Sequence, residues 1–448
     1  MNRAKKKITT ARGLAVQHLD RIEQEGAYIG LTRGDIDVDP REERQATDYV
    51  AGVTRWKRRF DFILSQFYRG DLEGMESTLK QILRIGLYDL LILDTPPHAA
   101  LNETVELAKQ MVRPGAGGLV NGILRNVVRQ RDRLPEPKMD DLAERLAITH
   151  SHPTWLVRRW LDRFGPDDTE ALLVWNNTRP TYGVRVNTLK TSMADFQARL
   201  DTLEVKWEPS PYLDDFVRVQ GLQPLIREGV LDEGLCAVQD ESAGLVVRLL
   251  DPQPGETLVD ACAAPGGKAL YAAERMDNQG RVLAFDLHEG RLQMVRDAAR
   301  DQGIDIVETA TVDLRDLVQQ TTPPQADRVL VDAPCSGLGV LAKRADLRWN
   351  RSPEEISHLA TLQDALLDAA AHLVRPGGLL VYSTCTIDPE ENHDRVTGFL
   401  NRHADFQIES ATGFVPDDCV SPEGYLITLP HRHHMDGAFG VRLRRKHS

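Results

Sequence analysis

Two cysteines that directly follow apolar, strand-like runs offer the clearest potential for chemistry in this chain. Cys335 lies in the segment Asp-Ala-Pro-Cys-Ser-Gly that starts at Asp332, and Cys385 lies 50 residues later in Val-Tyr-Ser-Thr-Cys-Thr. A thiolate is a strong nucleophile, and a carboxylate beside it can accept hydrogen bonds from the polar edge of a base. Two thiols that end two strands of one sheet are expected to face one cleft.

Addition to a pyrimidine ring is the chemistry that such a pair could perform. C5 of cytosine is a poor nucleophile, but a thiolate that adds to C6 makes C5 enamine-like and able to attack an electrophilic methyl group. A thiol with a pKa of about 8.5 is only slightly ionised at neutral pH, so the site must promote loss of the proton. Asp332 could hold the N3/N4 edge of the base and stabilise protonation of N3. The spacing leaves open which cysteine attacks.

A turn of small residues indicates a cofactor site on the same sheet. The run DACAAPGGK, from Asp260 to Lys268, follows an apolar strand-like segment and opens a helix. Small residues let the backbone approach a ligand closely, and the run is neither the dinucleotide GxGxxG pattern nor a P-loop. Asp286, at the end of the next strand, could accept hydrogen bonds from a ribose diol, and Asp313 could reach an adenine amino group. The alternative interpretations are an ordinary strand-to-helix turn for the run and a helix N-cap for Asp286.

The elements that position these residues are predicted from residue 236 onward. Short β-branched runs such as TLVDACA, RVLAFDL, DRVLVDA and GGLLVYSTC alternate with helical stretches. This alternation is typical of a doubly wound, mostly parallel sheet, in which ligands bind outside the carboxyl ends of the strands. Residues 236–448 are therefore expected to form a Rossmann-like catalytic domain.

The preceding residues predict two further modules. Residues 1–140 show helical periodicity, as at 81–93 and 119–130, with Asn102 as a plausible N-cap, and they predict an all-α bundle. A proline-rich stretch at 134–137 ends that region. Residues 141–235 begin as a helical connector and continue with strand-like runs at 181–190 and 205–219. They predict a small α/β module.

Composition excludes several protein classes. The chain has 448 residues, of which 41% are hydrophobic and 27% charged, so it is neither collagen-like nor largely disordered. It contains no apolar run of about 20 residues and no signal-peptide core, which predicts a cytoplasmic protein without a membrane partner. Its five cysteines include no CxxC pair, so we expect free thiols and no metal. His431, His433 and His434 are interpreted as a polar loop.

Charge is unevenly divided along the chain. The net charge is −12, but residues 1–140 carry 23 basic against 20 acidic residues, whereas residues 141–448 carry 32 against 47. Basic residues cluster around Trp56. Phosphate binding depends on such local patches rather than on net charge, although a solvated face is the alternative.

Taken together, these motifs resemble those of one enzyme family over nearly the whole chain. Residues 1–130 resemble the NusB antitermination-factor fold through ILRIGLYDLLILDTPPHAALNETVELAK and GLVNGILRNVVR. Residues 236–448 carry DACAAPGGK, LVDAPCSGLG with RADLRW downstream, and VYSTCTIDPEEN. The chain is similar to the RsmB (Sun) type of bacterial 16S rRNA cytosine-5 methyltransferases, within the Sun/nucleolar-protein family. The resemblance implies methyl transfer from S-adenosylmethionine to C5 of a cytosine in small-subunit rRNA, by a protein that we expect to be a monomer.

The resemblance also implies roles for individual residues. Cys385 would be the nucleophile that bonds to C6, Cys335 would assist product release, and Asp332 would lie near the cytosine. In DNA cytosine-5 methyltransferases the Pro-Cys cysteine attacks instead. The cofactor site would comprise Cys262, Ala263, Ala264, Pro265, Gly266, Gly267, Lys268, Asp286, Asp313 and Asp332. The candidate RNA contacts are Arg55, Lys57, Arg58, Arg59, Lys343 and Arg344.

Other functions stay open at this point. A tRNA cytosine-5 methyltransferase is opposed only by the NusB-like region. An RNA-binding or antitermination factor with a vestigial catalytic domain is opposed by the intact pair of thiols and the intact Pro-Gly-Gly-Lys turn. Methylation of an amino nitrogen is opposed by Asp-Ala-Pro-Cys, because that reaction needs no thiol nucleophile.

Overall fold

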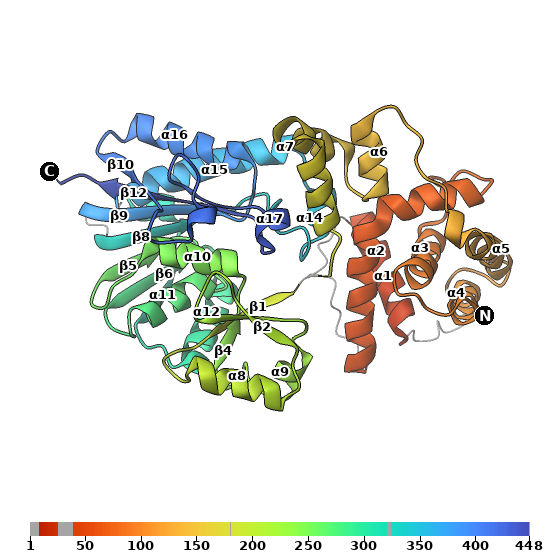
Figure 1. Ribbon diagram of the computed structural model, residues 1–448, viewed down its shortest axis with the longest axis horizontal. Helices are drawn as coiled ribbons and strands as arrows, with labels where there is room; N and C mark the ends of the chain where they lie inside the picture. Colours follow the sequence, from red (N-terminus) through yellow and green to blue (C-terminus); the bar gives the residue numbers. More distant parts are fainter. Residues whose placement is uncertain (1–8, 26–38, 180, 320–323, 448) are drawn as a thin grey trace. The chain divides into compact units, whose positions relative to one another are not determined.

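A computed structural model describes residues 9–25, 39–179, 181–319 and 324–447 of the chain (Figure 1). It divides into two compact units. The first takes the chain up to Thr178 together with Arg344–Asn350, and the second takes Arg179–Lys343 and Arg351–Ser448. Among the described residues, no helix is both long and apolar enough to cross a membrane.

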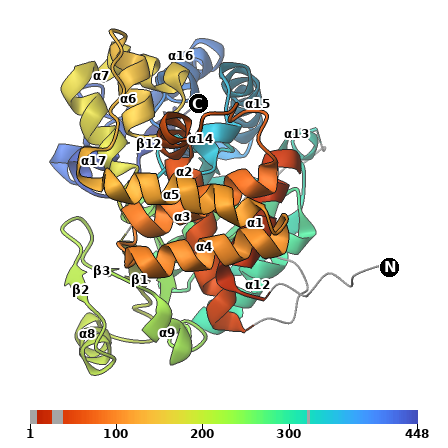
Figure 2. The ribbon, with the colours of Figure 1, turned by 90° about the vertical axis from the view of Figure 1, so that its right-hand side faces the viewer.

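The first unit is built from helices (Figure 2). They are α1 (Ala11–Glu25), α2 (Pro40–Phe67), α3 (Ser77–Leu91), α4 (Pro97–Met111), α5 (Ala116–Arg129), α6 (Leu142–Thr149), α7 (Thr154–Trp175) and, from later in the chain, α14 (Leu347–Asn350), with a 3-10 turn at Arg131–Arg133. Apolar side chains of α1 to α5 form one core, in which Ile82, Leu83 and Leu87 of α3 are fully buried. The expectation of an all-α region is confirmed.

One helix boundary in this unit was predicted wrongly. Asn102 does not cap a helix, because α4 already begins at Pro97. Proline suits the first helical position, since it lacks the N–H that would have no partner there and its φ is already helical. The helix therefore starts at the Pro-Pro break and runs through Asn102.

A small antiparallel sheet opens the second unit, with strand order β2-β3-β1-β4. Its strands are β1 (Tyr182–Val186), β2 (Trp207–Pro209), β3 (Phe216–Val219) and β4 (Cys236–Val238), and α8 (Met193–Thr202) and α9 (Gln223–Arg227) complete the module. Val184, Val217 and Phe196 belong to its core. The predicted small α/β module is confirmed.

A large sheet follows, in the order β10-β12-β9-β8-β5-β6-β7, with β11 paired to β12. The strands are β5 (Thr257–Asp260), β6 (Arg281–Asp286), β7 (Val307–Thr311), β8 (Ala326–Asp332), β9 (Val374–Thr384), β10 (Phe406–Glu409), β11 (Leu426–Thr428) and β12 (Ala438–Arg445). The pairs from β7 across to β9 are parallel, whereas β12 is antiparallel to its neighbours. The predicted doubly wound sheet is confirmed.

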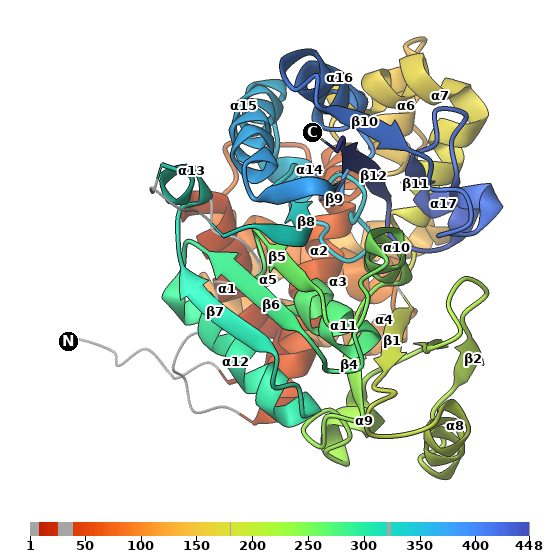
Figure 3. The same ribbon diagram turned by 90° about the vertical axis from the view of Figure 1, so that its left-hand side faces the viewer.

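Helices cover both faces of this sheet (Figure 3). One face packs on α10 (Glu241–Leu250), α11 (Gly267–Arg275) and α12 (Glu289–Gln302), and the other on α13 (Leu314–Leu317), α15 (Pro353–Ala371) and α16 (His393–Arg402). Successive strand residues alternate between these cores: Leu258 and Leu330 lie in the first, Val259 and Val331 in the second. Burial on both faces explains why the strands read as continuous apolar runs.

The expected domain limits stay predictions. The change from helices to the small sheet falls between the end of α7 and the start of β1, and the limits expected near 140 and 235 lie within the first and second unit, respectively.

Candidate active site

The residues expected to carry chemistry lie at one edge of the large sheet. Asp260, Asp286 and Asp332 are the last residues of β5, β6 and β8, and Cys385 directly follows β9. In the sheet, β6 and β7 lie on one side of β5, whereas β8 and β9 lie on its other side. The strand order therefore reverses between β5 and β8. Ligands bind at such switch points in open α/β sheets.

The turn after β5 is held in a compact conformation. The Ala263 N–H donates to the Phe285 carbonyl at 2.8 Å, and the Gly266 N–H donates to the Ala263 carbonyl at 2.7 Å. Gly266 has φ +107°, and a Cβ there would lie 3.2 Å from Val295. Glycine is therefore required, and the turn leads directly into α11.

Lys268 and Asp332 form an ion pair inside the site. The Lys268 Nζ lies 2.7 Å from Asp332 Oδ2, and the Ser383 hydroxyl donates to Asp332 Oδ1 at 2.8 Å. Burial by itself would lower the pKa of Lys268, but the nearby Asp332 and Cys385 raise it above its ordinary value. A cation is thus maintained beside the Asp332 carboxylate.

Asp260 has a different environment from Asp332. Its side chain is 1% exposed, and Oδ1 accepts the Cys262 N–H at 3.3 Å. Burial, together with repulsion from Asp332, raises the pKa of Asp260 to about 7. Burial likewise raises the pKa of the Cys262 thiol, which stays protonated at neutral pH.

The two candidate thiols lie side by side, and both are free, as expected. The sulfur atoms of Cys335 and Cys385 are 3.2 Å apart. The hydrogen bond with Cys385, together with burial, raises the pKa of Cys335 well above its ordinary value. Cys335 is therefore the thiol that keeps its proton, whereas Cys385 is the more exposed of the two.

Gly339 brings the backbone of both cysteine loops together. Its N–H donates to the Cys385 carbonyl at 3.1 Å, and its carbonyl accepts the Gly437 N–H at 2.8 Å. A Cβ at this position would lie 2.8 Å from the Cys385 carbonyl oxygen and 2.2 Å from that of Gly437. No other residue type fits this contact without displacing a backbone.

The other expected cofactor residues lie where strands end, with partners of their own. Asp286 is 7% exposed and accepts the His288 N–H at 3.0 Å. Asp313 caps α13, and both its oxygens accept hydrogen bonds from the Arg315 guanidinium at 2.9 and 2.6 Å. These bonds lower the pKa of Asp313.

Gln239 is a site residue that sequence reasoning missed. It is 7% exposed, and neither polar atom of its amide has a hydrogen-bond partner among the described residues. Its Nε2 lies 3.7 Å from the position of a Cβ on Gly267, at the start of α11. A buried amide without partners is costly and is typical of a group that binds a ligand. No local pattern in the sequence marks this position.

The basic residues around Trp56 make contacts within the first unit; they are Arg55, Lys57, Arg58 and Arg59. Arg55 is 9% exposed, and burial lowers the pKa of Lys57. The Arg58 guanidinium donates to the His152 carbonyl at 2.8 Å, and Arg59 pairs with Glu136 at 2.6 Å. Because Arg55 is buried, we do not carry it forward as an RNA contact.

Lys343 and Arg344 differ in exposure. Lys343 pairs with Asp240 and, at 3.0 Å, with Asp436, and these two carboxylates outweigh burial and raise its pKa. It is committed to an internal ion pair, so we also withdraw it as an RNA contact. The Arg344 side chain is 54% exposed and lies 3.5 Å from Asp346.

The expected absence of a metal stays a prediction. Asp418, Cys419 and His433 each offer one ligand atom within 4.8 Å of the others. Burial raises the pKa of the Cys419 thiol to about 12, and His433 Nδ1 already accepts the Leu429 N–H at 2.8 Å. This bond holds His433 in the short helix α17 (Pro430–His433), which also contains His431 and has His434 as its C-cap. The expectation of a polar loop here is therefore wrong.

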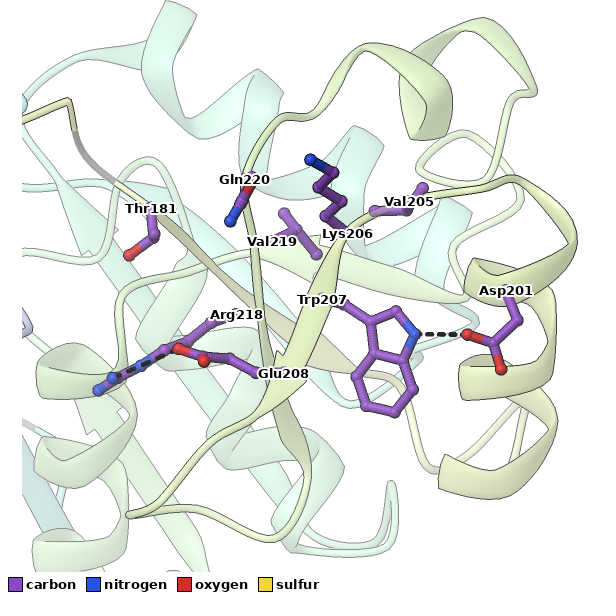
Figure 4. Close-up of a pocket in the computed structure, with 9 residues that line it drawn as sticks. All are labelled: Thr181, Asp201, Val205, Lys206, Trp207, Glu208, Arg218, Val219 and Gln220. Atoms are coloured by element: carbon purple, nitrogen blue, oxygen red, sulfur yellow. Dashed lines mark hydrogen bonds and ion pairs between the residues drawn. The ribbon is translucent and has the colours of Figure 1, made fainter.

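A separate hollow lies on the small sheet (Figure 4). It has a volume of about 340 Å³ and is lined by Thr181, Asp201, Val205, Lys206, Trp207, Glu208, Arg218, Val219 and Gln220. The Trp207 indole N–H donates to Asp201 of α8 at 2.8 Å, which ties the ring to that helix. The hollow contains no thiol, so it is not the reaction site. It combines the Trp207 ring with Lys206 and with Arg218, which pairs with Glu241 at 2.6 Å, and its lining also includes the acids Asp201 and Glu208.

Comparison with known proteins identifies families along the chain. The family described as 16S rRNA methyltransferase RsmB/F matches residues 247–444, and the NusB family matches residues 9–129. A ferredoxin-like domain of RsmF/B-like methyltransferases matches residues 152–225, so the small α/β module is of the ferredoxin-like type.

Relatives match at full length. A protein from Bacillus subtilis named probable ribosomal RNA small subunit methyltransferase B is 34% identical over 98% of this chain and 100% of its own. A protein of the same name from Synechocystis is 36% identical over 91% of this chain and 92% of its own. An Escherichia coli protein named ribosomal RNA small subunit methyltransferase B is 34% identical over 98% of this chain and 100% of its own.

Solved structures share the fold. The crystal structure of PH0851 is 28% identical, with a TM-score of 0.80 over 99% of this chain and 100% of its own. The Pyrococcus horikoshii NSun6 structure with SFG is 23% identical, with a TM-score of 0.59 over 66% of this chain and 99% of its own, and shows the same fold.

Proposed function

The chain belongs to the RsmB/F family of 16S rRNA methyltransferases, and on this premise we propose that it methylates C5 of a cytosine in small-subunit rRNA through a covalent bond between Cys385 and C6. The observation that carries the proposal is the pair of thiols 3.2 Å apart at the ends of neighbouring strands. Methylation at an exocyclic nitrogen or at a ribose oxygen would need no thiol.

The residues at the carboxyl edge of the sheet fit S-adenosylmethionine. This cofactor supplies an electrophilic methyl group when bound. The turn Cys262–Lys268 offers backbone to a ligand, and Asp286 ends the strand at which a ribose is expected. Asp313 would accept the adenine amino group through a lone pair left by Arg315. The unpartnered amide of Gln239 and the buried carboxyl of Asp260 support a polar, cationic ligand here.

Cys385 is the better candidate for the nucleophile. Its side chain is exposed, and its interaction with Lys268 contributes to the raised pKa of that lysine. Cys335 beside it keeps its own proton. The Cys335 S–H lies within hydrogen-bond distance of the Cys385 sulfur, and the Lys268 cation interacts with Cys385 as well. The thiolate would bond to C6 while the C5=C6 electron pair moves toward C5 and Asp332 holds the base edge.

The later steps follow from the same geometry. C5 would take the methyl group as the bond between the methyl carbon and the donor sulfur breaks, a base would then remove the C5 proton, and the electron pair of that C–H bond would re-form C5=C6 as the C6–S bond breaks. The departing Cys385 thiolate would again accept the Cys335 S–H. Cys335 would therefore assist release because it stabilises the leaving sulfur.

RNA must present an unstacked base to this site. We propose Lys57, Arg58 and Arg344 as phosphate contacts, since their side chains reach solvent at least in part, whereas Arg59 is committed to its ion pair with Glu136 as Lys343 is to its own. Methylation of tRNA is the competing function, and the substrate comparison in the experiment below decides between them.

The test uses labelled S-adenosylmethionine and a denaturing gel. Wild type, Cys335→Ala and Cys385→Ala are each incubated with naked small-subunit rRNA, with small ribosomal particles and with tRNA. We expect labelled rRNA from wild type, a slowly migrating protein–RNA band from Cys335→Ala, and neither from Cys385→Ala. Cys236→Ala is the matched control, because this thiol is buried in the small sheet and should leave turnover unchanged.

Three results would contradict the proposal. A covalent band from Cys385→Ala instead of Cys335→Ala would reverse the two thiol roles. Label on tRNA alone would replace the substrate, and no label on any RNA would favour a binding factor with a vestigial catalytic domain.

A further inference from the structure

The peptide groups on both sides of Cys335 are held by one pair of buried side chains. The Gln363 amide of α15 donates to the Pro334 carbonyl at 2.9 Å, and the Ser336 N–H donates to Glu391 Oε2 at 2.8 Å. The same Gln363 amide also donates to Glu391 Oε2 at 2.9 Å. The loop that carries Cys335 is therefore fixed before and after the thiol.

The residues on both sides of Cys385 are held by Asn392, which follows Glu391 in the chain. The Thr384 hydroxyl donates to Asn392 Oδ1 at 2.5 Å, and Asn392 Nδ2 donates to the Thr386 carbonyl at 3.0 Å. One amide thus spans the loop that carries Cys385.

The two sets of contacts are joined to each other. Glu391 and Asn392 are neighbours in the chain, so their Cα atoms are about 3.8 Å apart. The Ser336 hydroxyl donates to the Thr386 hydroxyl at 2.9 Å, and the Tyr382 hydroxyl of β9 donates to the Glu391 carbonyl at 2.6 Å. The two cysteine loops and this dipeptide form one network.

This network is buried at a cost to stability. Glu391 and Gln363 are 0% exposed, and Asn392 is 6% exposed. Burial raises the pKa of Glu391 despite its hydrogen bond from Ser336. Apolar side chains of similar volume often match or exceed the stability of buried polar networks. The contribution of the polar groups is therefore to position the loops that they bind.

We propose that Glu391 and Asn392 are positioning residues that fix the separation of the two thiols, Glu391 with Gln363 through the Cys335 loop and Asn392 through the Cys385 loop. The separation itself is independent of any reaction. The catalytic consequence rests on the proposed function, in which Cys385 attacks the base and Cys335 assists release. A displacement of about 1 Å at such a site can cost about a hundredfold in rate.

Oxidation by diamide tests the separation without RNA or cofactor. Two thiols lose two protons and two electrons to form the S–S bond, and the N=N bond of diamide is reduced to the hydrazine. The rate at which a peptide linked between Cys335 and Cys385 appears is measured by mass spectrometry. We expect Glu391→Leu and Asn392→Leu to form it at least about tenfold more slowly than wild type.

Two further variants separate positioning from general damage. Glu391→Gln keeps an oxygen that can accept from both Ser336 and Gln363, so it should oxidise at the wild-type rate. Asp364→Leu removes the 2.5 Å contact with Arg395 between α15 and α16 and should also leave the rate unchanged. If Glu391→Leu does not fold, as judged by thermal unfolding, Gln363→Met takes its place, because it removes the contacts of α15 with the Pro334 carbonyl and with Glu391. Wild-type rates in the folded leucine or methionine variants, or a slow rate in Glu391→Gln, would overturn the proposal.

The denaturing gel with labelled S-adenosylmethionine and rRNA then assigns each residue to its thiol. Glu391→Leu should accumulate the covalent protein–RNA band, as expected for Cys335→Ala, whereas Asn392→Leu should form no such band and should label less rRNA than wild type. If wild type labels no RNA while the oxidation rates follow the expected order, the proposed function fails and the positioning role stands. If wild type labels rRNA and both leucine variants label it equally well, the positioning role fails and the proposed function stands.

Discussion

Asp260 and Asp332 end neighbouring strands, yet their carboxyl groups have different partners. Asp332 accepts from Lys268 and Ser383, whereas the contact found for Asp260 among the described residues is a backbone N–H. One lysine cannot neutralise two carboxylates equally. Burial and the charge of Asp332 therefore raise the pKa of Asp260 to about 7. Pairs of acids whose environments separate their pKa values are typical of active sites.

The pKa of Asp260 predicts how cofactor affinity depends on pH. A cationic ligand favours the carboxylate, so binding below pH 7 must release a proton. The affinity for S-adenosylmethionine should rise by up to about tenfold per pH unit below 7 and level off above it. Calorimetric titration at pH 6, 7 and 8 measures this dependence, and Asp260→Asn should abolish it.

The same titration with S-adenosylhomocysteine identifies the cation involved. This product keeps the amino group but lacks the sulfonium charge, so an equal pH dependence assigns the interaction to the amino group. An affinity of wild type for S-adenosylmethionine that is constant or falls between pH 6 and 8 would contradict the prediction. The stability of the ligand-free protein depends on pH in the opposite direction. The folded state binds the extra proton on Asp260, so the free energy of unfolding decreases as the pH rises from about 4 to about 7.

At the scale of elements, the small sheet presents its own surface. The Trp207 side chain of β2 packs partly against the core of this module, while Lys206 and Arg218 lie beside the same hollow (Figure 4). Its indole is held by Asp201 and so needs no reordering on binding. An aromatic face beside cations is the arrangement on which single-stranded nucleic acid stacks a base.

Substitution of this tryptophan tests whether the module contacts RNA. Trp207→Ala should weaken rRNA binding by about 1–3 kcal/mol, which is the range found for one stacked base. Fluorescence anisotropy with a labelled rRNA fragment measures the change. Ile226→Ala is the matched control, because that side chain is 50% exposed on α9 of the same module. Equal affinities of wild type and Trp207→Ala would exclude a stacking role.

At the scale of the whole molecule, the chain returns to the first unit after the cysteine loop of β8. Arg348 is 0% exposed, and its guanidinium donates to the Ser151 carbonyl at 3.1 Å, the Asn176 carbonyl at 3.0 Å and the Asn177 side chain at 2.9 Å. The Trp349 indole N–H donates to the Thr54 carbonyl at 2.7 Å. A segment far along the sequence thus completes the helical unit.

Loss of this arginine should loosen the first unit. Arg348→Met leaves buried carbonyl groups without donors, and we expect it to lower the free energy of unfolding of this unit by about 2–4 kcal/mol. Hydrogen exchange of amides in α2 and α7, followed by mass spectrometry, should accelerate accordingly. Arg344→Met, at an exposed position of the same segment, should change exchange little. Unchanged protection in α2 and α7 of Arg348→Met would contradict the prediction.

Local chain chemistry is sufficient to predict much of this protein. The period of apolar residues determines the helices of the first unit and the alternation of strand and helix in the second. The turn from Asp260 to Lys268 can be predicted from the sequence because the strand, its glycine turn and the next helix are contiguous in the chain. For the same reason the strand-end positions of Asp286 and Asp332 were expected correctly. The family followed from motifs of this contiguous kind.

Tertiary structure alone decided what distant residues do together. The register of β8 and β9 brings the loops of Cys335 and Cys385 together, and Gln363, Glu391 and Asn392 reach those loops from elsewhere. Arg55 and Lys343 looked like surface cations, but burial and carboxylates from other elements commit them to internal contacts. Sequence patterns report periodicity and local turns, whereas burial and pairing depend on which elements become neighbours. That choice is made by the packing of the whole chain.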